Sequence, residues 1–364
     1  MFSKDSARQA DACRFCWMCR HICPVAGSTG REGWTPRARG LMISMIERGT
    51  PYTAEIAEAM YHCTLCDACA NDCATGYKPS EFIREARTMA VVEDIAPEAV
   101  VKAIETIQSR GNIFGEKSFD KIFAAVGELP EKAETLLFLG QTASSVYPQA
   151  AINTAELLKK AGVDFTILRD EPASGAYLSE LMGFTGDVQA MAAAAAEKIE
   201  TTGAKTLVVL NPADAVMFRD EYAKYGLLRD VDVVTATAFA AKLIADGALK
   251  PVPQSIKGSL QEPVKLTRGL DETAPFKAIA AAVGVKLNEM FLNGKMSRCI
   301  GTVPFDMYDP ATVREMVHVR CEDAQRMGSR LIITASPDDY YIMSKHAYGP
   351  VKIADIFEIL NQSC

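Results

Sequence analysis

The sequence lacks any apolar run of membrane-spanning length, and it has no excess of basic residues. No stretch approaches the ~18–20 apolar residues that cross a bilayer, and residues 1–5 show neither the apolar core of a signal peptide nor a twin arginine. The formal charge is −7 and the pI is near 5.4, whereas a nucleic-acid partner favours a clustered basic face. We therefore expect a cytoplasmic protein without a nucleic-acid partner or a transmembrane segment, which reaches a membrane only peripherally, through a partner.

Motifs of nucleotide and hydrolytic chemistry are also missing. The Gly- and Ser-rich stretch 24–33 has neither the GxGxxG nor the GxxxxGK[ST] pattern, so we interpret it as a connection. No flavin or nicotinamide fingerprint, Ser/His/Asp set or paired-carboxylate motif occurs. Reduced pyridine nucleotides and hydroxy acids deliver electron pairs, which a flavin must split into single electrons. We therefore expect no catalytic residues in this chain and no substrate turnover by the chain alone.

Cysteine, by contrast, is abundant, and eight of the eleven cysteines form two runs. Both runs have the spacing C-x2-C-x2-C-x3-C, over residues 13–23 and 63–73. In two-cluster ferredoxins, three cysteines of such a run hold one cubane cluster and the fourth reaches the neighbouring cluster. The spacing therefore predicts two [4Fe-4S] clusters. Their predicted ligands are Cys13, Cys16, Cys19 and Cys73 for one cluster, and Cys63, Cys66, Cys69 and Cys23 for the other.

Structural zinc and disulfides are the alternatives for these cysteines. Zinc needs four ligands per site and usually draws them as separated pairs, so two uninterrupted quartets fit it poorly. Disulfides suit small secreted domains, which this long chain without a secretory signal does not resemble. The three remaining thiols, Cys299, Cys321 and Cys364, are expected to be buried or incidental, because free cysteine behaves as a small hydrophobe.

Several side chains beside the predicted ligands are weaker candidates. Charged or imidazole groups near a cluster either tune it through hydrogen bonds and charge or are merely exposed loop residues. These candidates are His21, His62, Arg14 and Arg20. The two tryptophans, Trp17 and Trp34, are expected to cover a cluster rather than to bind a ligand.

The hydrophobic pattern predicts a helical region followed by an α/β region. Helices are expected at 36–49, 54–61 and 80–93, the first with an apolar face of Leu41, Met42, Met45 and Ile46. From residue 130, expected strands at 136–140, 163–168, 206–210 and 231–235 alternate with helices at 150–161, 189–201, 213–225 and 238–248. A second round from 264 has helices at 276–283, 311–326 and 353–361, and strands at 285–290 and 330–334.

This alternation implies parallel sheets covered by helices on both faces. The predicted fold class is thus α plus α/β. We expect three domains: a helical domain at 1–115 with the two clusters, a first α/β half at 130–250 and a second at 260–364.

The twin cysteine runs resemble a known domain. Three features carry the resemblance: the helix between the runs, the segment Trp17-Met18-Cys19-Arg20-His21-Ile22-Cys23-Pro24, and the stretch Thr35-Pro36-Arg37. They resemble the α-helical ferredoxin domain of heterodisulfide reductase iron-sulfur subunits, which also occurs in glycolate, lactate and anaerobic glycerol-3-phosphate oxidising enzymes. One difference is Ala74, where a proline often follows the last cysteine.

The remainder of the chain is similar to the cysteine-rich "CCG" domain of the same families, but its cysteines are missing. The family's CCG motifs correspond to residues 171–175 (EPASG) and 298–301 (RCIG), and its C-P-x-C motifs to 211–214 (NPAD) and 336–339 (SPDD). Serine, asparagine and aspartate are harder ligands than thiolate and replace it poorly on iron. The resemblance therefore implies a degenerate CCG region, which docks partners and positions the cubanes without the disulfide chemistry of the relatives.

The sequence thus predicts an iron-sulfur electron-transfer subunit of anaerobic metabolism. We expect it to relay single electrons between a flavin-containing subunit and another redox partner. The parent complex would be a flavin-based dehydrogenase, an electron-bifurcating transhydrogenase or a heterodisulfide-reductase-like assembly. One alternative is a self-contained disulfide or quinone-linked reductase that uses the α/β region, against which the missing CCG ligands count. Another is a regulatory iron-sulfur sensor, against which the absence of a DNA-binding motif counts.

Overall fold

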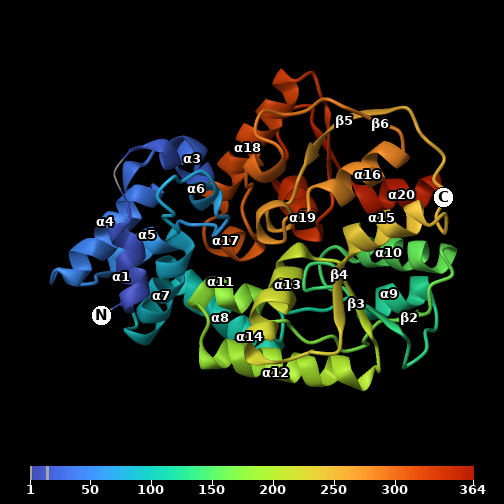
Figure 1. The fold of residues 1–364 in the computed structure, drawn as a ribbon, viewed down its shortest axis with the longest axis horizontal. Coiled ribbons are helices and arrows are strands. Elements are labelled where there is room, and N and C mark those ends of the chain that lie inside the picture. The colour runs from blue at the N-terminus through green and yellow to red at the C-terminus, as the bar shows by residue number, and fades with distance from the viewer. Residues whose placement is uncertain (1, 14–15) are drawn as a thin grey trace.

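The N-terminal part of the chain is helical, as predicted. The computed structural model describes residues 2–13 and 16–364, and Figure 1 shows the N-terminal helices together at one end of the molecule. The predicted helices at 36–49, 54–61 and 80–93 are confirmed as α4, α5 and α7. The elements are α1 (Lys4–Asp11), α2 (Met18–Ile22), α3 (Pro24–Thr29), the 3-10 turn η1 (Glu32–Trp34), α4 (Pro36–Glu47), α5 (Ala54–Tyr61), α6 (Ala68–Asn71), α7 (Pro79–Val92) and α8 (Glu98–Arg110).

The predicted apolar face of α4 is only half right, since Met42 and Ile46 pack against the core of the helical region. Leu41 and Met45 are 44% and 43% exposed, whereas Ile43 is fully buried. The close approach of Gly40 to Tyr77 fixes the orientation of the helix, because a methyl group at Gly40 would collide with the tyrosine hydroxyl. The buried face of α4 is therefore set by packing around a glycine, and hydrophobicity alone does not indicate it.

The first α/β half contains four parallel strands in the order β2-β1-β3-β4. All four predicted strands and the four helices between and after them are present, although the helix expected at 213–225 has a π-helical middle turn. The elements are α9 (Phe119–Val126), β1 (Thr135–Phe138), α10 (Pro148–Lys160), β2 (Phe165–Thr166), α11 (Ala176–Met182), α12 (Gly186–Thr201), β3 (Thr206–Val209), α13 (Pro212–Val216), η2 (Met217–Tyr222), α14 (Ala223–Tyr225), β4 (Asp232–Thr235) and α15 (Ala236–Ala245).

The second half repeats this topology, with the parallel order β6-β5-β7-β8. The second round of strands and helices was predicted to begin at 264, which is too late, and the prediction missed β5. Residues 353–355, predicted as the start of the last helix, belong to strand β8 instead. The elements are β5 (Ile256–Gln261), η3 (Lys265–Gly269), α16 (Ala274–Ala282), β6 (Val285–Leu287), η4 (Gly294–Met296), α17 (Val303–Tyr308), α18 (Pro310–Arg326), β7 (Leu331–Thr334), α19 (Pro337–His346), β8 (Lys352–Asp355) and α20 (Ile356–Ser363).

Strand β5 escaped prediction because its buried residues, apart from Leu260, are polar or glycine. Ser259 and Gln261 are completely buried, and the Ser259 hydroxyl donates to the backbone oxygen of Asn288 at 2.6 Å. A side chain at Gly258 would crowd the backbone oxygen of Leu331 on the neighbouring strand. These contacts replace the β-branched side chains that usually signal a buried strand.

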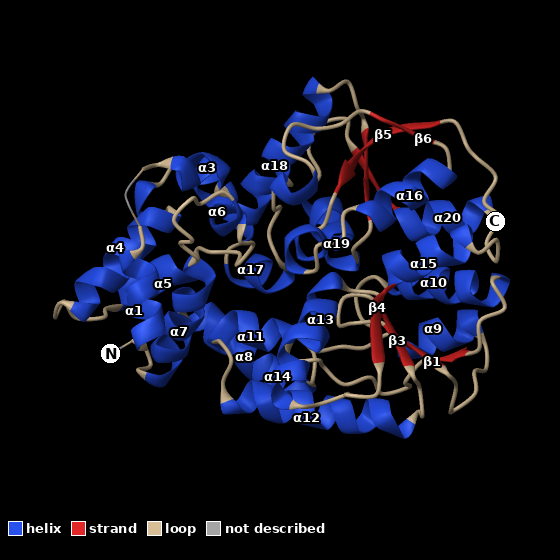
Figure 2. Ribbon diagram, viewed as in Figure 1, coloured by secondary structure: helices blue, strands red, loops and turns tan. Residues whose placement is uncertain are grey.

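The two halves face each other across helices, as Figures 1 and 2 show. Helix α10 packs against α20 and α15 packs against α16, and one apolar core runs through both sheets. A second apolar core joins the helical region to both halves. The fold is therefore a helical ferredoxin-like region followed by two parallel-sheet units, which confirms the predicted class. Within the part of the chain that the structure describes, no helix is both long and apolar enough to cross a membrane.

Candidate iron-sulfur centre

The two cysteine runs fold alike around a left-handed residue. Trp17 follows Cys16 with φ of 68°, and Asp67 follows Cys66 with φ of 55°. Each of these residues precedes a short helix, α2 or α6, that carries the third cysteine of its run. Positive φ is costly for residues other than glycine and persists where surrounding contacts demand it. The repeated conformation indicates that both loops are shaped for the same task.

Four thiols from both runs line one cavity. They are Cys63, Cys66 and Cys69 of the second run and Cys23 of the first. Cys23 reaches this cavity because it lies at the junction of α2 and α3 and is only 6% exposed. The structure thus brings together the set of cysteines that the spacing predicts for one cluster.

The other four cysteines include an exposed one, Cys16. Cys13, Cys19 and Cys73 are half-buried, as are Cys63, Cys66 and Cys69. The Cys73 thiol lies 3.2 Å from the Thr75 hydroxyl, which donates to the backbone oxygen next to Cys13, that of Ala12, at 3.1 Å. The last cysteine of the second run is therefore tied to the segment that begins the first run. Of the predicted tuning residues, Arg14 lies outside the described residues.

The chemistry of these thiols fits an iron-sulfur cluster. Burial, helped by neighbouring thiols of its own run, raises the pKa of Cys19 to about 11. Burial also raises the pKa of Cys23 to about 11, and places that of Cys69 well above its ordinary value. A cationic metal offsets the charge of thiolates such as those of Cys19, Cys23 and Cys69, so metal binding and their deprotonation are coupled.

The structure brings the four thiols around a cavity and forms no ready-made site for a single ion in the part of the chain that it describes. Among residues 2–13 and 16–364, no three His, Cys, Asp or Glu side chains approach closely enough to hold one metal ion. The four thiols named above line a cavity.

Two buried arginines hold the backbone that leads into the second run, and the sequence interpretation missed both. Arg39 and Arg87 are 1% and 2% exposed. Arg39 donates to the backbone oxygens of Ala59, at 2.8 Å, and His62. Arg87 donates to the backbone oxygens of Met60, at 3.0 Å, Cys63 and Glu180. Their spacing in helices gives no signal of burial, since arginine is usually exposed.

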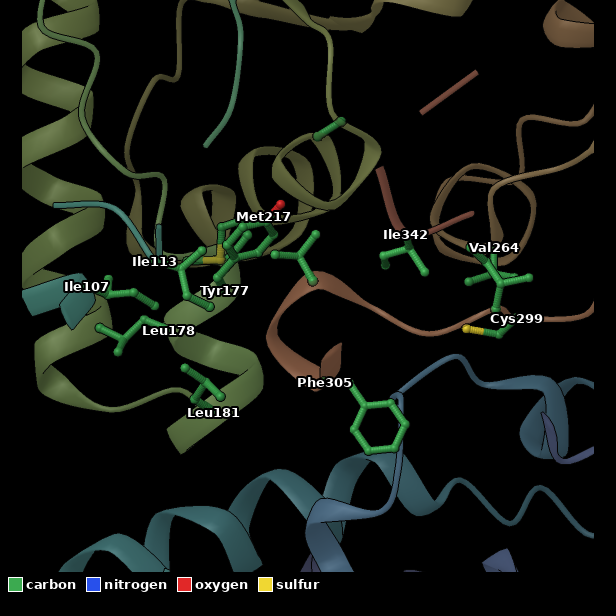
Figure 3. Close-up of a cluster of buried hydrophobic side chains, with 14 of the residues drawn as sticks. Ile107, Ile113, Tyr177, Leu178, Leu181, Met217, Val264, Cys299, Phe305 and Ile342 are labelled. Atoms are coloured by element: carbon green, nitrogen blue, oxygen red, sulfur yellow. The ribbon is translucent and has the colours of Figure 1, made fainter. Parts of the chain in front are cut away.

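The second α/β half also reaches the second run. The Arg268 guanidinium donates to the Cys66 backbone oxygen at 2.6 Å. Interaction with the buried Cys299 thiol lowers the pKa of the Cys66 thiol. Figure 3 shows Cys299 and Phe305 facing the ribbon of the N-terminal segment. Cys299 and Cys321 are buried, as predicted, whereas Cys364 is exposed.

His62 is part of a packed contact rather than an exposed loop residue. Its ring stacks on Trp34 with the centroids 3.5 Å apart, and its Nδ1 lies 3.0 Å from the Asp309 carboxylate. The residue is 8% exposed. His21, by contrast, is exposed. The contact fixes His62, the neighbour of Cys63, against the start of α18.

Four segments correspond to the CCG and C-P-x-C motifs, and three of them, 171–175, 211–214 and 336–339, meet in a buried polar network. Asp338 accepts hydrogen bonds from Thr142 and Tyr177, both at 2.6 Å, and from the Asn211 amide at 3.3 Å. Ser174 donates to Asp214. The fourth segment, 298–301, lies at the second cysteine run instead. Hydroxyl, amide and carboxyl groups thus bond to one another at the positions where the resemblance leads us to expect cysteines.

Burial raises the pKa of every carboxyl group in this network. The values are about 8 for Glu171, about 7 for Asp214 and about 6 for Asp338. Glu171 accepts the backbone N–H groups of Leu139 and Gly140 at 2.7 and 2.8 Å, which only partly offsets its desolvation. The network therefore takes up protons near neutral pH.

A groove of about 930 Å³ lies beside the second cysteine run, where all three parts of the chain meet. Cys66 lines both this groove and the cavity of the four thiols. The groove is lined by charged side chains, among them Arg84, Glu180, Lys265 and Arg268. The Lys265 ammonium lies 3.1 Å from the Glu180 carboxylate. The groove provides a route from solvent to a thiol of the second run.

Comparison with known proteins supports iron-sulfur chemistry. Residues 9–77 match the family described as a 4Fe-4S dicluster domain. One component of the dihydromethanophenazine:CoB–CoM heterodisulfide reductase of Methanosarcina barkeri is 26% identical over 90% of this chain and 87% of its own length. An iron-sulfur-binding oxidoreductase of Bacillus subtilis, FadF, is 23% identical over 97% of this chain. A ferredoxin of Chromohalobacter salexigens, described as membrane-anchored, is 25% identical over 80%.

This chain spans 59% and 49% of the last two relatives. A crystal structure of a hypothetical protein from Helicobacter pylori covers the whole chain and 73% of its own, with a TM-score of 0.56 and 12% identity, which shows the fold alone. The predicted resemblance to iron-sulfur subunits of the heterodisulfide reductase type is confirmed. The chain binds 4Fe-4S and resembles electron-transfer subunits of oxidoreductases.

Proposed function

We propose that the chain carries two [4Fe-4S] clusters and relays single electrons between a flavin-containing subunit and a second redox partner. The cavity lined by Cys23, Cys63, Cys66 and Cys69 is the observation that supports this most strongly. Its fourth thiol comes from the other run, which is the ligand sharing expected of a two-cluster ferredoxin. The remaining thiols, Cys13, Cys16, Cys19 and Cys73, would hold the first cluster. We keep the three-part division at 1–115, 130–250 and 260–364 within this proposal.

The positions of Cys16 at the surface and of Cys66 in the wall of the groove support a relay with two ends. Cys16 is exposed, so the first cluster would exchange electrons at the surface of the helical region. Cys66 lies in the wall of the groove, so the second would exchange electrons there. Each cluster, when bound, gains and loses one electron at a time. The chain's own residues hold the backbone of the second site through Arg39 and Arg87.

The α/β region supports a non-catalytic role. Its CCG-like segments bond to one another through Asp338, Asn211 and Ser174, and these groups are poor ligands for iron. The alternative of a self-contained disulfide or quinone-linked reductase would require substrate chemistry in this network. We therefore place the two-electron chemistry on a partner.

Anaerobic iron and sulfide analysis with EPR of the reduced protein tests the clusters. We expect about eight irons and eight sulfides per chain, because eight thiolates supply the ligands of two cubanes. Four irons, or stoichiometric zinc, would contradict the assignment.

Reduction by different donors tests the relay. The flavin-free chain should accept electrons from dithionite or a reduced flavoprotein, but not from NADH or NADPH alone, since it has no group that splits a hydride. Reduction of a disulfide or a quinone with NADH at an enzymatic rate would favour the reductase alternative.

A further inference from the structure

An unusual apolar surface lies in the loop of the first cysteine run. Trp17 and Met18 are 47% and 55% exposed, although both are large side chains that a core would ordinarily bury. The left-handed backbone at Trp17 belongs to the cluster loop. The Arg37 guanidinium lies 3.6 Å from the indole centroid and so holds the ring in place. A fixed, exposed tryptophan beside methionine and arginine is the composition of a protein interface.

Arginines surround this apolar surface. Arg20 and Arg37 share a single acid, Glu32, at 3.2 and 2.6 Å. Arg31 is exposed and lies over the Trp34 ring, with its guanidinium carbon 4.2 Å from the centroid. Three arginines with one carboxylate leave the surface positively charged.

The charge of this segment is opposite to that of the whole chain. Residues 12–41 contain one acid and, besides the buried Arg39, four arginines, whereas the chain has a net charge of −7. The second run and the residues after it, 63–78, contain two acids and one lysine. Positive charge is therefore concentrated around the first run, and a partner with a negative surface would be drawn to this end of the molecule.

We propose that Trp17, Met18, Arg20, Arg31 and Arg37, here called the Trp17 surface, dock a one-electron carrier protein with an acidic surface. This rests on the proposed relay and names the partner at its first end. The apolar part needs the area of a protein to cover it, and the arginines provide the electrostatic steering. The reduced carrier loses one electron and the first cluster gains it, so no bond forms or breaks.

The test uses the full chain with its clusters and reduced flavodoxin, an acidic one-electron carrier, in anaerobic stopped-flow measurements. The rate constant for cluster reduction should be high at low ionic strength and fall as salt is added, because exposed charges are screened over about 8–10 Å. Arg31→Glu should lower the low-salt rate by about tenfold or more, and the two proteins should converge at high salt. Trp17→Ala should lower the rate at every salt concentration.

Matched variants separate local from general effects. Lys250→Glu changes the net charge by the same amount at an exposed position in the link between the two sheets, and should leave the rate within about twofold, since it lies outside the steering surface. Arg31→Gln should give an intermediate rate. Iron content and EPR signals should be the same in all variants, because Arg31 is no predicted ligand.

The result that would overturn the docking surface is an unchanged flavodoxin rate in Arg31→Glu, or an equal loss in Lys250→Glu. Dithionite distinguishes this failure from that of the relay: if dithionite reduces both clusters while the charge variants have no effect, only the docking surface is wrong. If dithionite reduces no cluster, the proposed function itself is wrong.

Discussion

The second cysteine run and the CCG-like network are surrounded by opposite kinds of buried charge. In the helical region the buried side chains Arg39 and Arg87 donate to backbone oxygens around the second cysteine run. In the CCG-like network the buried groups are carboxyls, Glu171, Asp214 and Asp338. Cations are placed beside thiolates, and protonatable acids are placed where thiolates are absent.

Electrostatics explains the difference. Four thiolates and a cluster carry negative charge into a low-dielectric site, where nearby guanidinium groups offset part of the desolvation cost. Without a cluster, a buried carboxyl lowers its own cost by staying protonated, which its raised pKa reflects. The helical region is thus built to hold charge and the α/β network to avoid it.

Removing a shared ligand should have the largest effect. Cys23→Ser should abolish the cluster held by Cys63, Cys66 and Cys69, and so about half of the iron, because serine is a harder and weaker ligand for iron. Cys73→Ser should damage the other cluster instead. EPR of the reduced variants distinguishes the two signals. If Cys23→Ser instead lost the EPR signal of the cluster assigned to Cys13, Cys16, Cys19 and Cys73, ligand sharing would be contradicted.

Much of the helical region could be predicted from the sequence, because cysteine spacing and helix caps are local signals. The backbone contacts that support the second run could not. Arg39 and Arg87 reach carbonyls about 20 residues or more away in sequence, and no periodicity reports such a contact. The contact of His62 with Asp309 joins residues 247 positions apart and was equally invisible.

In the α/β region, the alternation of elements was predictable where strands are uniformly apolar, as in 206–209. The prediction failed at β5, because its buried serine and glutamine form hydrogen bonds with loops of the same half. The absence of CCG cysteines was plain from the sequence. That the replacing residues 171–175, 211–214 and 336–339 form one hydrogen-bonded network required the structure.

Removing a buried arginine should come next in effect. Arg87→Met keeps most of the side-chain volume but leaves the backbone oxygens of Met60, Cys63 and Glu180 without their donor, and each buried unpaired group costs about 1–3 kcal/mol. We expect a loss of about 3 kcal/mol or more in unfolding free energy and a second cluster that is lost first during aerobic exposure. Denaturant unfolding and EPR measure these effects.

The matched control is Arg110→Met, an exposed arginine at the end of α8. It should change stability by less than about 0.5 kcal/mol. If Arg87→Met behaved like this control, the buried arginines would not support the second run.

The α/β network should make stability depend on pH. Since burial raises the pKa of Asp214 to about 7 and of Glu171 to about 8, the folded state holds protons that the unfolded state releases near pH 4. This contribution is complete below about pH 4 and is lost as the pH rises through 7 to 8. The protein should therefore be less stable at pH 8.5 than at pH 6, measured by denaturant unfolding.

Asp214→Asn sharpens this test, because its amide keeps an acceptor for Ser174 and cannot ionise. The variant should lose less stability between pH 6 and 8.5 than the parent, by about 1–2 kcal/mol. Asp230→Asn, at an exposed position before β4, should keep the parent profile. An unchanged profile in Asp214→Asn would show that this carboxyl is ionised throughout.

The smallest effect is expected at Cys299, where the α/β region touches the helical one. Cys299→Ser should keep the iron content of the parent, because Cys23, Cys63, Cys66 and Cys69 already supply the ligands of one cubane. The serine hydroxyl can also donate to the Cys66 sulfur, so the midpoint potential of the second cluster should move little in Cys299→Ser. Cys299→Ala removes the donor, so in that variant the midpoint potential should fall further. Cys321→Ser, at a buried position in α18, should change neither quantity. EPR-monitored redox titration with iron analysis makes the measurement. If Cys299→Ser lost iron or a third paramagnetic species, the thiol would be a ligand, and the α/β region would have kept a cluster site after all.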